Sequence, residues 1–113
     1  MTKEFVESRG ADFALTTTSR GAYHNGFEWS PGRTRWFFEE GKVYEPKPVN
    51  IIKNQASSKG IDYIDVYGAL QNSEVHPLFY SVDMHWTPEG QKIVGEAVAQ
   101  FIVKKIDGSF QNQ

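Results

Sequence analysis

The stretch SVDMHWTPEGQKIVGEAVAQFI, residues 81–102, decides how the chain folds because it joins a polar cluster to a long amphipathic pattern. Apolar residues recur at helical spacing through its second half, which predicts a helix with one buried face. Thr87 and Pro88 belong to the residue types favoured at the N-cap and the first position of a helix. We therefore predict that a long helix begins at Pro88 and packs against the rest of the fold. The apolar residues of this helix are Ile93, Val94, Ala97, Val98, Phe101 and Ile102.

The segments before this helix alternate between helical and extended patterns. A helix is predicted to end at Gly10, and a strand with a run of β-branched threonines follows over residues 11–18. A second helix is predicted over residues 49–60 and a second strand over residues 61–66. The order helix, strand, helix, strand, helix implies parallel strand pairing with right-handed crossovers. The sequence therefore predicts an α/β layer, with no internal repeat and no second domain.

The long connection over residues 20–48 is rich in glycine, proline, asparagine and aromatic residues. Its length favours a functional or packed loop, and RTRWFFEE, residues 33–40, suggests a helical turn within it. Its rings either fill a small core or form a platform on which a sugar stacks. Arg33 and Arg35 either contact an anionic group or stay solvated on the surface. The rings are those of Tyr23, His24, Phe27, Trp29, Trp36, Phe37 and Phe38.

The composition of the 113 residues fits one small folded domain and excludes several classes of function. Lys and Arg number 12 against 14 Asp and Glu, and they are scattered, which argues against nucleic-acid binding. The chain has no cysteine, so disulfides and thiolate sites are excluded and the compartment stays open. No apolar run reaches the length of a membrane span, so we expect a soluble chain. Any export signal would lie upstream of Met1.

Asp83 and His85 form the candidate catalytic pair. Residues two apart on an extended segment point to the same side, with Met84 between them pointing away. A neutral imidazole can serve as general base in nucleophilic hydrolysis, and a carboxylate on its other nitrogen fixes the ring and stabilises the imidazolium. The following helix N-terminus disfavours the imidazolium while Asp83 favours it, so the two effects oppose one another.

Two other interpretations of this motif stay open at the level of sequence. Asp83 and His85 can simply hydrogen-bond the backbone where the helix begins. Alternatively, the two residues together with His76 or His24 could coordinate zinc or another divalent ion, although the spacing matches no strong zinc signature.

The stretch VDMHWTPEGQKIVGEAVAQFI resembles the C-terminal signature of the SGNH (GDSL-like) hydrolases: an Asp, a nearby His, a turn with Pro or Asn, a Gly and a terminal amphipathic helix. GADFALTTT, a long loop and IIKNQASSKGIDYIDVYGAL precede it in the order of the second half of that fold. The resemblance covers nearly the whole chain, and the final motif is its specific part. The Asp-x-His spacing followed by Trp is similar to the branch that includes polysaccharide O-acetyltransferases and acetylesterases.

The resemblance implies a three-layer, flavodoxin-like α/β fold with a parallel sheet, of which residues 1–113 form a single partial domain, the C-terminal half. It implies an esterase or lipase that hydrolyses carboxylic esters through a Ser-His-Asp triad and needs no cofactor. His85 would be the general base and Asp83 its orienting acid, in preference to Asp65. The implied substrate is a small ester or an acetylated glycan. The alternatives are a polysaccharide O-acetyl esterase or acetyltransferase relative, and a non-catalytic binding or assembly module.

The family's nucleophilic serine follows the first strand in a Gly-Asp-Ser-like turn, and its oxyanion partners are a Gly and an Asn in later loops. No such turn precedes Asp83, so we expect a truncated fragment that is inactive or nearly so by itself. Uncovered strand edges and apolar helix faces would favour a homo-oligomer, with elements exchanged between copies. None of the serines has the expected strand-turn-helix context: Ser8, Ser19, Ser30, Ser57, Ser58, Ser73, Ser81 and Ser109.

Overall fold

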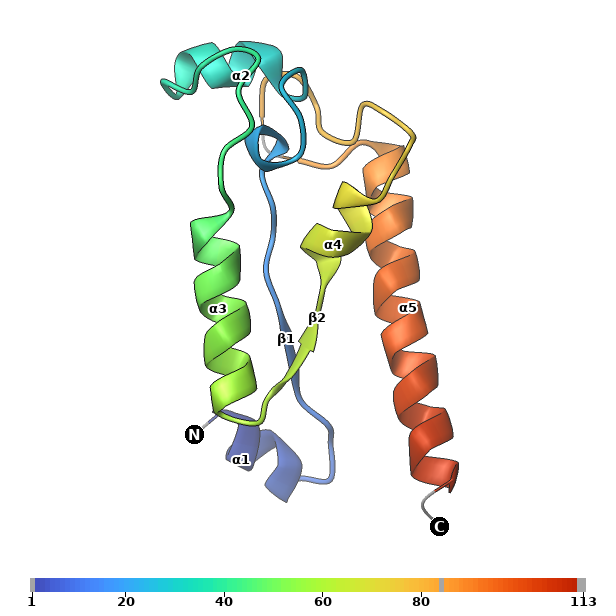
Figure 1. Ribbon diagram of the computed structural model, residues 1–113. Helices are drawn as coiled ribbons and strands as arrows, with labels where there is room; N and C mark the ends of the chain where they lie inside the picture. The colour runs from blue at the N-terminus through green and yellow to red at the C-terminus, as the bar shows by residue number, and fades with distance from the viewer. Residues whose placement is uncertain (1, 84, 112–113) are drawn as a thin grey trace.

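A pair of short parallel strands lies at the centre of the structure, a computed structural model that describes residues 2–83 and 85–111 (Figure 1). Strand β1 (Ala14–Thr16) pairs with strand β2 (Asp62–Ile64), and Leu15 lies opposite Tyr63. Within the described residues the sheet contains these two strands. The predicted parallel pairing is confirmed, although both strands are shorter than the sequence pattern suggested.

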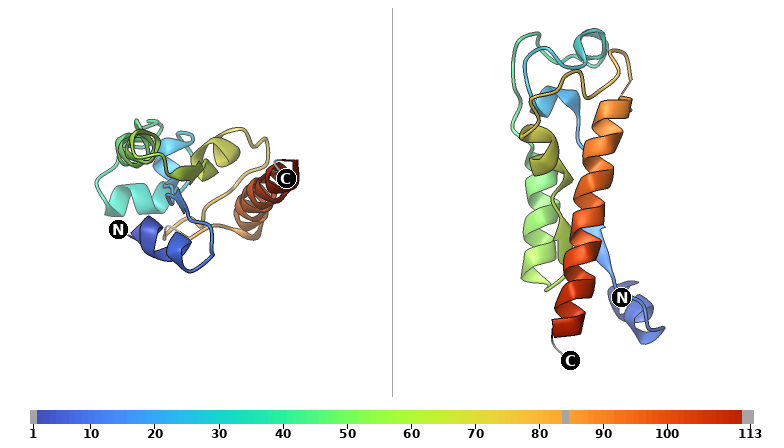
Figure 2. Two further views of the ribbon diagram at one scale, coloured as in Figure 1. Left: turned by 90° about the horizontal axis from the view of Figure 1, so that it is seen from below. Right: turned by 90° about the vertical axis from the view of Figure 1, so that its right-hand side faces the viewer.

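Helices flank the strand pair on different sides, as the views in Figures 1 and 2 show. Helix α3 (Lys47–Ser58) and helix α5 (Pro88–Gln111) both contact β2. Helix α1 (Thr2–Ser8) lies near the amino ends of the strands. The layering of helix, strands and helix is that of a partial α/β fold.

Two of the predicted helix ends are confirmed, and glycine is the reason at each. Gly10 has φ +82° and Gly60 has φ +65°, a left-handed conformation that a side chain disfavours. The residue that follows each glycine donates its backbone N–H to the carbonyl five residues earlier. Ala11 donates to Val6 at 3.3 Å, and Ile61 donates to Ala56 at 2.8 Å. This is the hydrogen bond of a Schellman motif, which satisfies the last carbonyls of the helix.

The predicted strand over residues 61–66 is wrong at its carboxyl end, where helix α4 (Val66–Gln71) begins. Asp65 caps this helix, since its Oδ1 accepts the backbone N–H of Gly68 at 2.9 Å. Val66 and Leu70 are four residues apart, so they share one face of α4, and both are buried. A short apolar run is compatible with either a buried strand or a buried helical turn. Here the N-cap Asp65 favours the helical turn.

The long loop contains a 3-10 helix, η1 (Gly21–Tyr23), and helix α2 (Ser30–Arg35). The helical turn expected over residues 33–40 exists but lies earlier in the chain. Arg33 is fully buried, so neither of its expected roles, contact with an anion or solvation, is correct. Its guanidinium instead donates to backbone carbonyls of the same loop, those of Asn25, Glu28, Glu39 and Lys42.

The central apolar cluster lies between α4 and the start of α5. It is formed by Val66, Leu70, Leu78 and Phe79, with Ile64, Trp86, Ile93 and Val94 packed around it. The predicted helix start at Pro88 is confirmed, and the Thr87 hydroxyl accepts the N–H of Gly90 at 3.2 Å as an N-cap does. The expectation that Met84 points away from its neighbours falls outside the described residues.

Candidate active site

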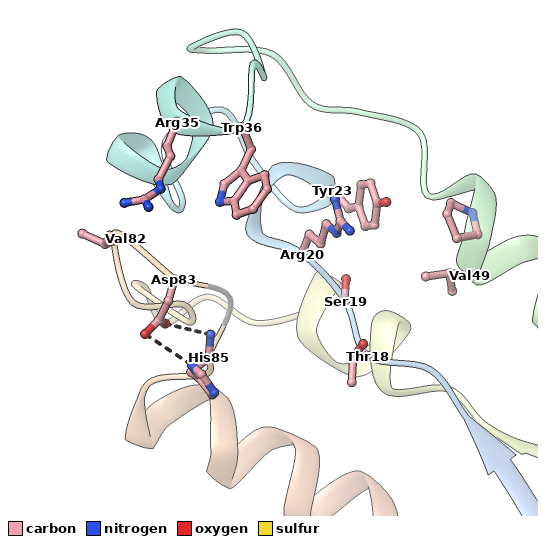
Figure 3. A pocket seen from close by; sticks show the side chains of 11 residues that line it. Thr18, Ser19, Arg20, Tyr23, Arg35, Trp36, Val49, Val82, Asp83 and His85 are labelled. Carbon is pink, nitrogen blue, oxygen red and sulfur yellow. Dashed lines mark hydrogen bonds and ion pairs between the residues drawn. The ribbon is translucent and has the colours of Figure 1, made fainter.

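A cavity of about 630 Å³ lies beyond the carboxyl ends of the strands, where the loops gather (Figures 1 and 3). This is the usual place for a ligand site in an α/β sheet. Its walls come from four regions: the end of β1, the loop around α2, the start of α3 and the turn before α5. The lining residues are Thr18, Ser19, Arg20, Tyr23, Arg35, Trp36, Pro48, Val49, Val82, Asp83 and His85.

Asp83 and His85 lie together at the rim of this cavity. The Asp83 Oδ2 is 3.3 Å from the His85 Nδ1, and the Asp83 Oδ1 accepts the backbone N–H of His85 at 2.9 Å. The His85 side chain is 83% exposed and that of Asp83 58% exposed. Asp83 therefore contacts one side of the imidazole while most of the ring faces solvent and cavity (Figure 3).

A tight turn, rather than an extended segment, brings these two side chains together. The segments on either side of the turn pair in antiparallel fashion, with a bridge between Phe79 and Trp86. The backbone N–H of Tyr80 donates to the His85 carbonyl at 3.0 Å, and that of Thr87 donates to the Leu78 carbonyl at 2.9 Å. The turn is thereby tied to the buried cluster and to the N-terminus of α5.

The pKa of Asp83 lies below its ordinary value, chiefly because the carboxylate accepts the His85 backbone N–H. Desolvation opposes this shift, whereas the hydrogen bond and the charge attraction to the His85 ring reinforce it. Asp83 is therefore an ionised acceptor at neutral pH. An ionised carboxylate beside an imidazole is the arrangement that stabilises an imidazolium.

The walls opposite the pair carry rings and cationic groups. Trp36 is 58% exposed and turns its ring into the cavity, where Tyr23, Arg20 and Arg35 also line the wall (Figure 3). Part of the aromatic loop fills the core, as one of its two predicted roles requires: Trp29 is buried and packs against Phe38 with ring centroids 5.7 Å apart. Stacking of a sugar on the exposed Trp36 ring stays a prediction.

A buried carboxylate that the sequence did not single out holds the segment leading to the turn that carries Asp83 and His85. The Glu28 side chain is 2% exposed. Its Oε2 accepts the N–H of Leu78 at 2.7 Å and lies 3.0 Å from the His76 Nδ1. Glu28 thereby connects the aromatic loop to residues 76–79.

The sequence also did not indicate a contact between a serine and a second histidine, His24. The Ser19 Oγ is 2.7 Å from the His24 Nε2, and the His24 Nδ1 is 2.9 Å from the Gln71 Oε1. Ser19 lies between β1 and the 3-10 helix η1, a single turn that leaves no periodic signal in the sequence.

The three histidines have different hydrogen-bond or ion-pair partners: His24 contacts Ser19 and Gln71, His76 contacts Glu28, and His85 contacts Asp83. Over residues 2–83 and 85–111, no group of three acidic, histidine or cysteine side chains could hold a metal ion. The Asp65 carboxylate is engaged elsewhere, as the cap of α4 and 3.8 Å from Lys53. Among the described helices none is both long and apolar enough to cross a bilayer.

Comparison with protein families identifies a relationship that agrees with this geometry. The family model described as an SGNH hydrolase-like domain, acetyltransferase AlgX, matches residues 38–113, which is more than half of the chain. No curated protein and no solved structure gives a significant match. The match confirms both the predicted SGNH relationship and the partial α/β fold. The chain therefore belongs to the SGNH hydrolase-like domain family of the acetyltransferase AlgX.

Proposed function

We propose that the chain carries the acid–base pair for making or breaking an acetyl ester, on a small molecule or on an acetylated glycan. His85 removes a proton from the attacking hydroxyl or water and returns it to the leaving oxygen. Asp83 orients the ring and stabilises the imidazolium that forms in between. The observation that carries this proposal is the 3.3 Å contact between the Asp83 Oδ2 and the His85 Nδ1 at the rim of the cavity.

The shape and lining of the cavity support a carbohydrate ester as the substrate. Sugars stack on flat rings, and Trp36 presents one within the same cavity as His85. Arg20 and Arg35 add hydrogen-bond donors along the wall. The matched family is described by an acetyltransferase, which agrees with acetyl transfer to or from a glycan.

The nucleophile is the missing part of the His85 site. Among the side chains that the structure describes, no serine hydroxyl bonds to the His85 ring; Ser19 bonds to His24, and Ser30 bonds to Glu40. General-base catalysis of water attack is still available to His85, but a complete Ser-His-Asp triad is not. We therefore propose that the chain by itself supports little or no rapid turnover.

Hydrolysis of 4-nitrophenyl acetate tests the acid–base role because this ester is reactive enough to be cleaved by a base without a serine. We expect slow hydrolysis that His85→Ala lowers by roughly a hundredfold, the lower end of general-base effects. Asp83→Asn should cause a smaller loss, since the ring remains but its partner no longer stabilises the imidazolium.

Two controls separate the site from a generic imidazole. Free imidazole at the same concentration gives the rate expected without a cavity, and Ser81→Ala changes an exposed neighbour that does not line it. Equal rates for the chain and for free imidazole would contradict the proposal. Release of acetate from an O-acetylated polysaccharide, measured on the same variants, extends the test to the glycan.

A non-catalytic binding module is the second candidate function, favoured by the high exposure of His85 and by the lack, among the described side chains, of a serine hydroxyl bonded to its ring. In that case Trp36→Ala would abolish binding to an O-acetylated polysaccharide in calorimetry, while His85→Ala would leave binding unchanged and no variant would alter acetate release.

We also propose that the chain self-associates. α3 and α5 carry apolar side chains that are about half exposed: Ile51, Ile52, Ile102, Val103 and Ile106. A two-stranded sheet leaves unpaired edges as well, and a second copy could cover both features. Exchange of elements between copies is one way to achieve this.

A further inference from the structure

Ser19, His24 and Gln71 form a second constellation of catalytic type, separate from the Asp83–His85 pair, in which Ser19 and His24 are buried and Gln71 is exposed. Its two contacts are short, 2.7 Å from the Ser19 Oγ to the His24 Nε2 and 2.9 Å from the His24 Nδ1 to the Gln71 Oε1. Ser19 is 4% exposed and His24 8% exposed. Ser19 and His24 precede the residues matched by the family, so that match assigns them no role.

The amide oxygen of Gln71 fixes which imidazole nitrogen carries the proton. Oε1 only accepts hydrogen bonds, so the His24 Nδ1 is the donor and the Nε2 lone pair faces the Ser19 hydroxyl. Tyr67 and Phe79 pack against the His24 ring, with centroids 5.0 Å and 5.5 Å from its own. A base in a fixed tautomer beside a hydroxyl is the arrangement that activates a serine.

His24 is also neutral at physiological pH. Burial lowers its pKa below the ordinary value, and the hydrogen bond to Gln71 and the negative charge of Glu28 oppose this shift. His76 adds to the lowering, and Tyr67 is the remaining titratable group packed against the ring. A neutral imidazole is the form that can accept the serine proton.

Ser19 faces the same cavity as the exposed pair. It follows β1 at the carboxyl end of the strand, whereas Asp83 and His85 lie on a different wall (Figure 3). An acyl group on the Ser19 oxygen would therefore lie in the space that the Trp36 ring and the His85 imidazole also line.

We propose that Ser19 is a nucleophile that accepts an acetyl group from an ester, with His24 as its base and Gln71 as a positioning residue. The Ser19 Oγ bonds to the carbonyl carbon while its proton moves to the His24 Nε2. The bond between that carbon and the leaving oxygen then breaks, and the leaving oxygen takes the proton from His24. Water or a glycan hydroxyl next attacks the carbonyl carbon of the acetyl-serine and gives its proton to an imidazole. The bond between that carbon and the Ser19 Oγ then breaks, and the Oγ takes a proton from the imidazole.

This inference deepens the proposed function, on which it rests, by naming the group that holds the acetyl. Gln71 orients the ring but carries no charge, so it stabilises the imidazolium less than a carboxylate does. The acetyl-serine should therefore form slowly and accumulate. Accumulation makes it detectable as a covalent adduct rather than only as turnover.

The test is to incubate the full chain with 4-nitrophenyl acetate and locate the acetyl group by peptide mass spectrometry. We expect one acetyl per chain on the peptide that contains Ser19, with a matching burst of 4-nitrophenolate. His24→Ala should slow the burst by about a hundredfold, and Ser19→Ala should remove the adduct. Gln71→Glu should keep the adduct and move the pH midpoint of acylation upward, because a carboxylate favours the protonated ring.

A second variant keeps the test valid if Ser19→Ala does not fold. The chain has no cysteine, so Ser19→Cys introduces a single thiol beside His24. We expect its alkylation by iodoacetamide to exceed that of a free thiol at neutral pH and to slow when His24→Ala is added.

Failure of this inference differs from failure of the proposed function. An adduct on another residue, or no adduct while His85-dependent hydrolysis persists, would overturn the role of Ser19 and leave the His85 proposal intact. An acetylated Ser19 with hydrolysis unaffected by His85→Ala would support Ser19 and overturn the role of His85.

Discussion

Two histidines in one small chain have opposite environments, and this difference sets what each can do. His85 is exposed at the cavity rim beside an ionised carboxylate, whereas His24 is enclosed by rings and bonded at both nitrogens. An exposed pair such as Asp83–His85 contributes little to stability, so its geometry is available for function. A buried histidine, in contrast, links the stability of the fold to pH.

We predict that the chain loses stability in mild acid because of His24. Its folded-state pKa is lowered, so the unfolded chain binds a proton more readily than the folded one. The stabilising contribution is fully present above the ordinary histidine value of 6.5 and is lost as pH falls through the lowered folded value. Urea denaturation at pH 7.5 and at a pH of about 5.5 measures this difference.

The matched variant is His24→Gln, which keeps a polar group but does not titrate. It should lower stability at neutral pH and show a smaller change between the two pH values. An unchanged pH dependence in this variant would show that His24 is not the source of the effect.

The role of Arg33 also depends on its environment, because this arginine is fully buried. Its guanidinium satisfies carbonyls across the aromatic loop, and an unsatisfied buried carbonyl costs about 1–3 kcal/mol. We predict that Arg33→Met destabilises the chain by more than about 3 kcal/mol in chemical denaturation, because several carbonyls lose a donor together.

Arg35 provides the control for this substitution because it is two residues away, exposed and on the cavity wall. Arg35→Met should change stability by less than about 0.5 kcal/mol, as ordinary surface substitutions do. Equal stabilities of Arg33→Met and Arg35→Met would contradict the role of buried Arg33 in stabilising the aromatic loop.

At the scale of elements, the start of α5 packs closely against the segment before it, because the backbone of Gly90 approaches that of Leu78. A Cβ on Gly90 would lie 2.3 Å from the Leu78 carbonyl oxygen, and backbone atoms cannot move aside as a flexible side chain can. The glycine of the TPEG motif is therefore required by packing. Gly95, five residues further along α5, has nothing within 4 Å of the same position.

We predict opposite effects for alanine at these two positions. Gly90→Ala should destabilise the chain by about 1–3 kcal/mol, because the helix must move away from Leu78. Gly95→Ala should stabilise it by about 0.5–1 kcal/mol, the intrinsic preference of a helix interior for alanine over glycine. Thermal and urea unfolding followed by circular dichroism measure both, and the same sign for the two variants would contradict the packing explanation.

At the scale of the whole molecule, the chain is elongated. Its radius of gyration is 16.3 Å, whereas a compact domain of this length has about 13 Å, and its extents are 51 × 26 × 19 Å. The buried apolar cluster lies at one end of α5, and the far end of that helix carries exposed Ile102 and Ile106. The surface therefore has apolar regions that this chain does not itself cover.

Self-association is the predicted consequence, measured by light scattering after size-exclusion chromatography. We expect a dimer or larger species whose population falls when Ile102→Glu and Ile106→Glu are introduced together. Lys92→Glu, on the polar side of α5, serves as the control for added negative charge. A monomer that melts cooperatively at every concentration would contradict the prediction.

Local chemistry explains what the sequence by itself determined. The left-handed preference of Gly10 and Gly60, the capping chemistry of Thr87 and the apolar spacing of α5 act over a few residues, so two helix ends, the start of α5 and the parallel strand pair could be predicted. The Asp-x-His motif likewise pointed to the pair at the cavity rim and to the family.

Only the tertiary structure decided which distant side chains meet. Ser19 and Gln71 are 52 positions apart and converge on His24 because β1 and β2 pair in parallel and bring their carboxyl ends together. The burial of Glu28 likewise depends on the contact between the aromatic loop and residues 76–79, and that of Arg33 on how the loop folds on itself. Sequence spacing carries local periodicity, whereas burial and long-range contacts arise only when the chain is packed in three dimensions.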